Sequence, residues 1–263
     1  MTMNCFKNRT LALVVFSSLT LILGGCATGA PEKKEPTAEE RATLYIQAAS
    51  ATLKDGDPTG ALQYLKMAEE LKPSMPEIYQ IRAIAFHTKH DLPSALREIK
   101  RAVALRPDGV EINNTYGKLL IDSGDYRAAE PPLLKAISDP TYRDAFKAYT
   151  NLGILHYRLD EMPKAVEYFD HAILESPLAA CIAYFYKGHI EMKLGHFKTA
   201  TQNYDHATQK FCAGFADGHL ALGIAYERNK QYDLARKKFL DVKQNFPNSK
   251  VAEQAMDRLH YLP

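Results

Sequence analysis

The chain of 263 residues lacks the sequence motifs of the common catalytic and nucleotide-binding sites. It contains no His-Glu-x-x-His zinc motif, no nucleophile elbow and no glycine-rich phosphate loop. Its 9 histidines are scattered through the sequence rather than grouped at metal-ligand spacing. We therefore expect no catalysis, no metal site, no cofactor and no small-molecule substrate.

The sequence also lacks a marked excess of charge of either sign. The 33 lysines and arginines and the 31 aspartates and glutamates give a formal net charge of +2 at pH 7. Both surplus positive charges, Lys7 and Arg9, lie in residues 1–25, which contain no acidic residue. The rest of the chain is neutral, so it has no overall basic character of the kind that favours a nucleic-acid partner.

The N-terminal residues have the organisation of an export signal. Two basic residues precede an apolar run, residues 11–23, which is too short for a convincing membrane-spanning helix. The run ends in the sequence Leu-Gly-Gly-Cys at residues 23–26, which resembles the bacterial lipobox. Residues 1–25 are therefore predicted to be a lipoprotein signal peptide, and Cys26 is predicted to become the acylated N-terminus.

The residues after this cysteine bear on where the protein resides. Ala27 stands where an aspartate commonly signals inner-membrane retention in Gram-negative lipoproteins. We therefore expect a lipid anchor in the outer membrane, with the protein facing the periplasm. Residues 26–41 are predicted to be the lipidated cysteine and a flexible tether, since the segment is rich in Pro, Gly, Lys and Glu.

A pattern of about 34 residues recurs along the rest of the chain. Each unit has a small residue, a large apolar residue four positions later and a further apolar residue three positions after that. Four units end in a proline: Ala61, Leu65, Ala68 and Pro73; Ala95, Ile99, Ala102 and Pro107; Ala165, Phe169, Ala172 and Pro177; Ala235, Phe239, Val242 and Pro247. Two units lack the proline in register: Ala129, Leu133 and Ala136; Ala200, Tyr204 and Ala207.

Six such units are typical of tetratricopeptide repeats, in which two antiparallel helices pack closely through small residues. The expected first helices supply a small residue twelve positions before that of the second: Ala49, Ala83, Gly117, Gly153, Gly188 and Gly223. The sequence predicts an all-α fold, a right-handed solenoid of six helix-turn-helix repeats over residues 42–247. Residues 248–263 are predicted to form a capping helix.

The third unit is irregular. Pro131 and Pro132 fall inside its second helix, where each removes a hydrogen bond and crowds the preceding turn. We expect this helix to be kinked, shortened or late in starting. The connector that follows, residues 138–144, is longer than the repeat period allows.

Two cysteines, Cys181 and Cys212, remain in the predicted exported domain. In the repeat frame, Cys181 opens the first helix of the fifth unit and Cys212 follows the end of its second helix. These two ends are neighbours in an antiparallel hairpin, so a disulfide is favoured over free thiols in an oxidising periplasm. Two cysteines alone do not suit structural zinc, which takes four ligands.

The repeat frame places the first helices along one concave surface. The predicted partner-binding groove consists of Ile84, Ile121, Ile154, Tyr157, Ile182, Phe185, His189, Met192, Leu220 and Ile224. Polar edges are expected from His87, Lys118, Arg158, His189, Lys193 and Arg228. Apolar anchors at helical spacing suit an amphipathic helix or an extended peptide. The alternative is that several of these residues are half-buried between neighbouring helices.

One stretch adds a family resemblance. An Asp-Pro-x-Tyr connector, residues 139–142, precedes an Asn-Leu-Gly helix, residues 151–153, and the segment 165–169 follows. With the lipobox and the six repeats, this stretch resembles the outer-membrane pilotins of type IV pilus systems, the PilF/PilW/Tgl group of lipoproteins. The resemblance implies a protein that binds the pilus secretin, the ring through which the pilus exits, and promotes its localisation and multimerisation.

A second class of function is compatible with the same fold, anchor and groove. A periplasmic scaffold lipoprotein would dock peptidoglycan hydrolases or the outer-membrane protein assembly machinery. The two hypotheses separate on phenotype, because loss of pili with normal cell shape favours the pilotin and altered envelope integrity favours the scaffold.

Overall fold

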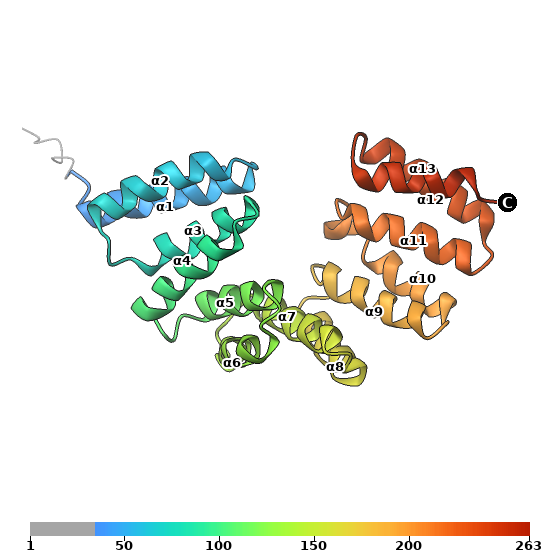
Figure 1. Ribbon diagram of the computed structural model, residues 1–263, viewed down its shortest axis with the longest axis horizontal. Helices are drawn as coiled ribbons and strands as arrows, with labels where there is room; N and C mark the ends of the chain where they lie inside the picture. Colours follow the sequence, from blue (N-terminus) through green and yellow to red (C-terminus); the bar gives the residue numbers. More distant parts are fainter. Residues whose placement is uncertain (1–34) are drawn as a thin grey trace, which may run out of the picture. The chain divides into compact units, whose positions relative to one another are not determined.

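The computed structural model describes residues 35–263, so the predicted signal peptide and Cys26 lie outside the described residues. These residues form thirteen α-helices, one short 3-10 helix and no strand (Figure 1). The elements are α1 Ala38–Lys54, α2 Pro58–Leu71, α3 Pro76–Thr88, α4 Leu92–Leu105, α5 Val110–Asp122, α6 Tyr126–Ile137, α7 Ala145–Arg158, α8 Met162–Glu175, α9 Cys181–Lys193, α10 Phe197–His206, η1 Lys210–Cys212, α11 Ala216–Arg228, α12 Tyr232–Asn245 and α13 Lys250–His260. The expected all-α architecture is confirmed.

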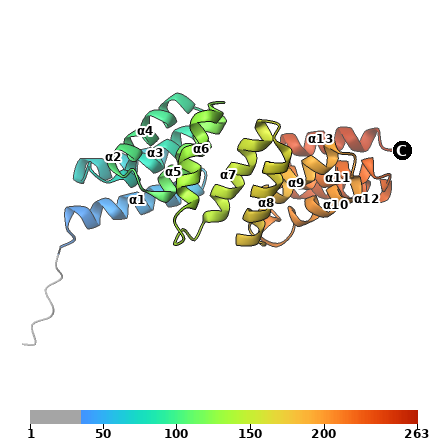
Figure 2. The ribbon, with the colours of Figure 1, turned by 90° about the horizontal axis from the view of Figure 1, so that it is seen from below.

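The helices pack as consecutive hairpins, which can be followed in Figures 1 and 2. The pairs are α1 with α2, α3 with α4, α5 with α6, α7 with α8, α9 with α10, and α11 with α12. Each second helix also packs against the first helix of the next pair, so the interior continues from one hairpin to the next. The last helix, α13, packs against α12 and α11.

The turn inside each hairpin uses a left-handed backbone conformation. Three repeats place glycine there, Gly56, Gly124 and Gly195, with φ of 85°, 80° and 76°. The other three place His90, Asp160 and Lys230 there, with φ of 60°, 61° and 59°. Glycine takes positive φ without a side-chain clash, so these glycines mark the turns that separate the two helices.

The first helix begins earlier than predicted. α1 starts at Ala38, inside residues 26–41, the stretch predicted to be tether. The reason is local: the Thr37 side chain accepts a hydrogen bond from the Glu40 backbone N–H, while the Glu40 carboxylate accepts one from the Thr37 N–H. This reciprocal cap stabilises the helix start independently of the repeat pattern.

The two prolines of the third repeat lie within a continuous helix. α6 begins at Tyr126, directly after its N-cap Asp125, so a late start is wrong. The helix has 12 residues, whereas α4 and α8 have 14 each. Of the three expectations, the structure therefore shows shortening.

Each hairpin interior pairs a small residue on the first helix with a large residue on the second. In the fourth repeat these residues are Gly153 and the fully buried Phe169, and a methyl group added at Gly153 would overlap the phenylalanine ring. The first repeat has Ala49 and Leu65 at the same positions, both fully buried. A larger residue on one helix is thus matched by a smaller one on its partner, as close packing requires.

We expect Gly153→Ala to lower the free energy of unfolding by about 1–3 kcal/mol, because the added methyl group overpacks a filled core. Adding Phe169→Leu should recover part of this loss, since the pair then matches Ala49 and Leu65. Urea denaturation of the wild type, both single variants and the double variant measures the coupling. If the changes in unfolding free energy of the two single variants simply add up in the double variant, the side-chain volumes at positions 153 and 169 are not matched to each other.

Candidate protein-binding groove

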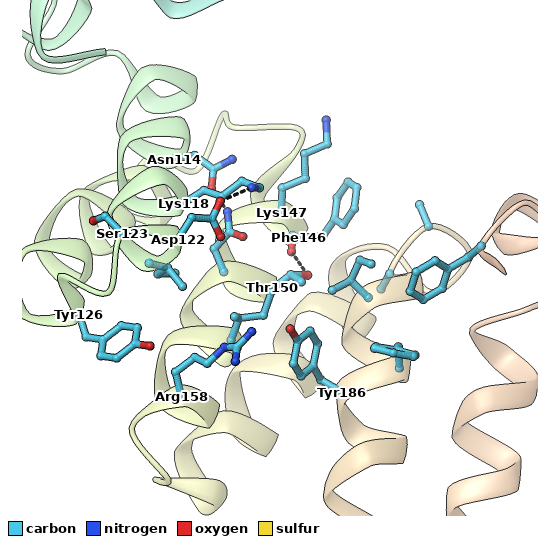
Figure 3. A pocket seen from close by; sticks show the side chains of 18 of the residues that line it. Asn114, Lys118, Asp122, Ser123, Tyr126, Phe146, Lys147, Thr150, Arg158 and Tyr186 are labelled. Carbon is cyan, nitrogen blue, oxygen red and sulfur yellow. Dashed lines mark hydrogen bonds and ion pairs between the residues drawn. The ribbon is translucent and has the colours of Figure 1, made fainter. Parts of the chain in front are cut away.

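A cavity of about 900 Å³ opens between the first helices of three consecutive repeats, α5, α7 and α9 (Figure 3). We call it the α5–α9 groove. Most of its lining comes from the first helices of these repeats, which the repeat frame assigns to partner binding. A volume of this size lies in the range of pockets that hold ligands.

Four of the predicted groove residues line this cavity: Ile121, Ile154, Ile182 and Phe185. Ile182 is 36% exposed, so its side chain is available to a partner. Ile121 is only 7% exposed, and for this residue burial between helices is the better description. Phe215 extends the apolar wall, with its ring centroid 5.0 Å from that of Phe185.

Polar side chains from α5 and α7 line the same cavity. Asn151 Nδ2 donates a hydrogen bond of 2.8 Å to Asn114 Oδ1, which joins the two helices. Lys118 Nζ lies 2.6 Å from Asp122 Oδ2, and the same oxygen lies 2.9 Å from His87 Nε2. The only carboxylate that lines the groove is therefore already paired within residues 35–263.

Tyr186 links the groove to the hairpin core beneath it. Its ring stacks on Phe169 at a centroid distance of 5.6 Å and meets Tyr157 edge-on at 5.0 Å. Burial raises the pKa of the Tyr186 hydroxyl, and the nearby Arg158 guanidinium acts in the opposite direction. The hydroxyl is thus protonated at neutral pH and can donate a hydrogen bond.

The remaining predicted groove residues lie elsewhere. Tyr157, His189, Met192 and Ile224 line a cavity of about 250 Å³. Leu220 and Ile224 line another, of about 450 Å³, together with residues of α13. Ile84, on α3, lines none of these three cavities. All the predicted groove residues except Ile84 thus line one of three hollows, and two of these hollows share Ile224.

His189 is a packing residue rather than a free polar edge. Its Nδ1 is hydrogen-bonded to the Tyr204 hydroxyl, and its ring centroid lies 4.2 Å from that of Phe185. Burial lowers the pKa of His189, and Lys193 lowers it further. The imidazole is therefore neutral at pH 7, which is the form whose Nδ1 can accept a hydrogen bond.

Comparison with known proteins agrees with this architecture. The tetratricopeptide-repeat family model matches residues 114–180 and 187–250. The chain belongs to the tetratricopeptide-repeat (TPR) proteins. The hairpins before residue 114 continue the same packing, because α1 to α4 contact one another as the later helices do.

The TPR chain is related to a type IV pilus assembly protein. PilF of Pseudomonas aeruginosa is 28% identical over 158 residues, an alignment that spans 59% of this chain and 63% of PilF, less than two thirds of that relative. The solved structure of P. aeruginosa PilF superposes with a TM-score of 0.66 at 23% identity, covering 84% of this chain and 99% of that chain. The structure of PilW, a type IV pilus biogenesis factor, gives 0.68 at 20% identity, covering 82% and 98%. The two structural matches show a shared fold.

Several groove residues were missed by sequence reasoning. Asn114 and Thr150 lie three positions before the small residue of their repeat, as Phe185 does in the fifth repeat. The TPR frame could have found them if polar residues had been considered at that position. Phe215 lies between η1 and α11, outside any helix, so no helical period points to it.

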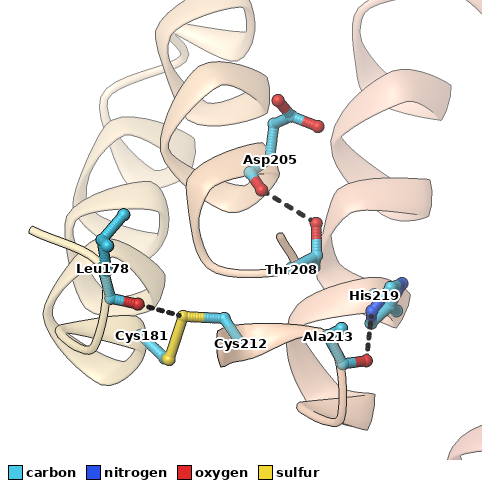
Figure 4. Close-up of a disulfide and its surroundings, with 7 residues drawn as sticks. All are labelled: Leu178, Cys181, Asp205, Thr208, Cys212, Ala213 and His219. Atoms are coloured by element: carbon cyan, nitrogen blue, oxygen red, sulfur yellow. Dashed lines mark hydrogen bonds between the residues drawn. A yellow bond between two sulfur atoms is a disulfide. The ribbon is translucent and has the colours of Figure 1, made fainter. Parts of the chain in front are cut away.

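A disulfide joins Cys181, the first residue of α9, to Cys212, the last residue of η1 (Figure 4). The Cα atoms are 5.5 Å apart. The Cys212 sulfur lies 3.6 Å from the Leu178 carbonyl oxygen, which is a packing contact because a disulfide sulfur carries no proton. Phe215 follows Cys212 by three residues, so the bridge helps to fix the segment that brings Phe215 into the groove.

Within residues 35–263, no group of three or more His, Cys, Asp or Glu side chains could hold a metal ion. In the same part of the chain, no helix has both the length and the apolar character needed to cross a membrane. The α5–α9 groove offers cations, amides and aromatic rings to a ligand.

Proposed function

We propose that this TPR protein binds the secretin of a type IV pilus system and promotes the localisation and multimerisation of that secretin. The observation that carries the proposal is the 28% identity to the pilus assembly protein PilF over 158 residues. The α5–α9 groove would supply the binding surface, because apolar anchors in a concave helical wall accept a helix or an extended segment. The proposed role is recognition rather than catalysis.

The proposal includes a lipid anchor. Residues 1–25 have the organisation of an export signal that ends in a lipobox, and Cys26 is the proposed acylation site. Ala27 favours the outer membrane, so the repeats would face the periplasm. Several acyl chains anchor a protein stably, at about 0.8 kcal/mol per buried methylene. The tether would then hold the groove close to the membrane in which the secretin ring forms.

The assembly state of the secretin in cells tests the proposal. Deletion of the gene is expected to leave the secretin as protomers, measured by native electrophoresis and immunoblotting of envelope fractions, and the wild-type gene should restore rings. Normal secretin rings in the deletion strain would refute the proposal. Normal pili with altered envelope integrity would instead favour a scaffold for peptidoglycan hydrolases or for the outer-membrane protein assembly machinery.

Ile182→Glu is expected to reduce the secretin recovered with the protein at least tenfold, because it places a charge in the apolar wall beside Ile154 and Phe185. Ile182 is 36% exposed, so the fold should persist, which circular dichroism checks. Leu174→Glu is the matched control, since Leu174 is 76% exposed and does not line the groove. Equal secretin recovery with the folded Ile182→Glu variant and the wild type would place secretin binding elsewhere.

A further inference from the structure

Among the cations that line the α5–α9 groove, Arg158 is the one that has no carboxylate partner within residues 35–263. It is the last residue of α7, it is exposed and it lines the groove. Lys118 and Lys147 line the same groove, but they pair with Asp122 and Asp144. Among the ion pairs found within residues 35–263, none includes Arg158.

The surroundings of Arg158 add neutral donors. Its guanidinium lies beside the Tyr186 hydroxyl, and Figure 3 shows the two groups facing each other. Tyr126 also lines the groove, and its hydroxyl points toward the side of the groove on which Arg158 lies (Figure 3). Within residues 35–263, three cationic side chains line the groove against one carboxylate, that of Asp122, which already contacts Lys118 and His87. The groove therefore favours an anion over a cation.

The chemistry of this corner suits a carboxylate. A guanidinium presents parallel N–H donors that match the two oxygens of a carboxylate, and a phenolic hydroxyl can supply a further donor. Ile154 precedes Arg158 by four residues on α7, so the two side chains lie on one face of the helix. A ligand that reaches Arg158 therefore meets the apolar wall within one helical turn.

We propose that the α5–α9 groove recognises a carboxylate next to a bulky apolar side chain on an extended or helical segment of a partner protein. Arg158 binds the carboxylate, and Ile154, Ile182 and Phe185 seat the apolar side chain. The inference rests on the proposed function only in using the same groove. It specifies the chemistry of the bound segment, whichever protein supplies that segment.

The test uses linear 12-residue peptides from a random phage-display library, selected on the full-length protein in detergent micelles. Selected peptides are expected to carry Asp or Glu within two residues of Phe, Leu, Ile or Met. The best peptide is then synthesised with a fluorophore, and its Kd is measured by fluorescence anisotropy. Replacing its Glu by Gln, or its Asp by Asn, should weaken binding to the wild type by about tenfold to hundredfold.

When the peptide binds the Arg158→Ala variant, the same replacement in the peptide should change the Kd less than twofold, because this variant lacks the partner of the carboxylate. Arg228→Ala is the matched control. Arg228 ends α11 at the same repeat position, does not line the groove, and its variant should behave as the wild type does. Arg158→Lys keeps the charge but loses the paired donors, so an intermediate loss is expected.

Selected peptides without an acidic residue would overturn the inference. So would an acid-to-amide replacement in the peptide that weakens binding to Arg158→Ala as much as binding to the wild type. Failure to enrich any linear peptide above an unrelated bait would overturn it too. These results are independent of the pilus readout. Carboxylate-dependent peptide binding together with normal secretin rings in the deletion strain would support this inference and refute the proposed function.

Discussion

Replacement of Phe169 by alanine is expected to lower the free energy of unfolding by about 3–5 kcal/mol. Phe169 is fully buried, and its ring occupies the space that Gly153 leaves on the facing helix. Without the ring a cavity remains, because α7 and α8 are also held by the neighbouring hairpins. Thermal unfolding followed by circular dichroism should show a Tm lower by about 6–20 °C, at about 2–4 °C per kcal/mol for a domain of this size.

Leu174→Ala is the control for this prediction. Leu174 lies on the same helix but is 76% exposed, so the free energy of unfolding should change by less than about 0.5 kcal/mol. Phe169 also stacks on Tyr186, which lines the groove, so Phe169→Ala should weaken peptide binding as well. A loss as small as that of Leu174→Ala would contradict the placement of Phe169 in the hairpin core.

The hairpins could be predicted from the sequence because their interior contacts recur at a fixed spacing. Gly153 faces Phe169, and Ala49 and Leu65 have the same spacing sixteen residues apart. The start of α1 could not be predicted in this way. It depends on reciprocal hydrogen bonds between Thr37 and Glu40, which lie before the first repeat signature. Local capping therefore starts the helix before residue 42, where the repeat period placed the beginning of the first unit.

The groove could be predicted only in part, because the repeat frame gives the face of a residue but not the packing around it. Ile154 and Ile182 were placed on the correct face, and both line the α5–α9 groove. His189 was placed on that face too, yet its ring packs against Phe185 and Tyr204 and lines a different cavity. Whether equivalent positions share one cavity depends on aromatic rings that differ from repeat to repeat.

Reduction of the Cys181–Cys212 disulfide is expected to lower the free energy of unfolding by about 3–4 kcal/mol. The bridge joins residues separated by 31 positions, and loop closure of that length restricts the unfolded chain by about this free energy at 25 °C. Thermal unfolding with and without dithiothreitol measures the change. The double variant Cys181→Ser, Cys212→Ser should unfold at the lower temperature in both conditions, which separates the bridge from other effects of the reductant.

The same bridge is expected to affect the groove, because it restrains the segment that carries Phe215. Phe215 packs edge-on against Phe185 at 5.0 Å, so a loosened segment removes part of the apolar wall. Affinity for a groove-binding peptide should therefore fall in the double serine variant, and Phe215→Ala should show the same fall with the disulfide intact. Unchanged affinity in both variants would mean that the bridge stabilises the fifth repeat without shaping the site. Alkylation of both cysteines without prior reduction would show that the bridge does not form.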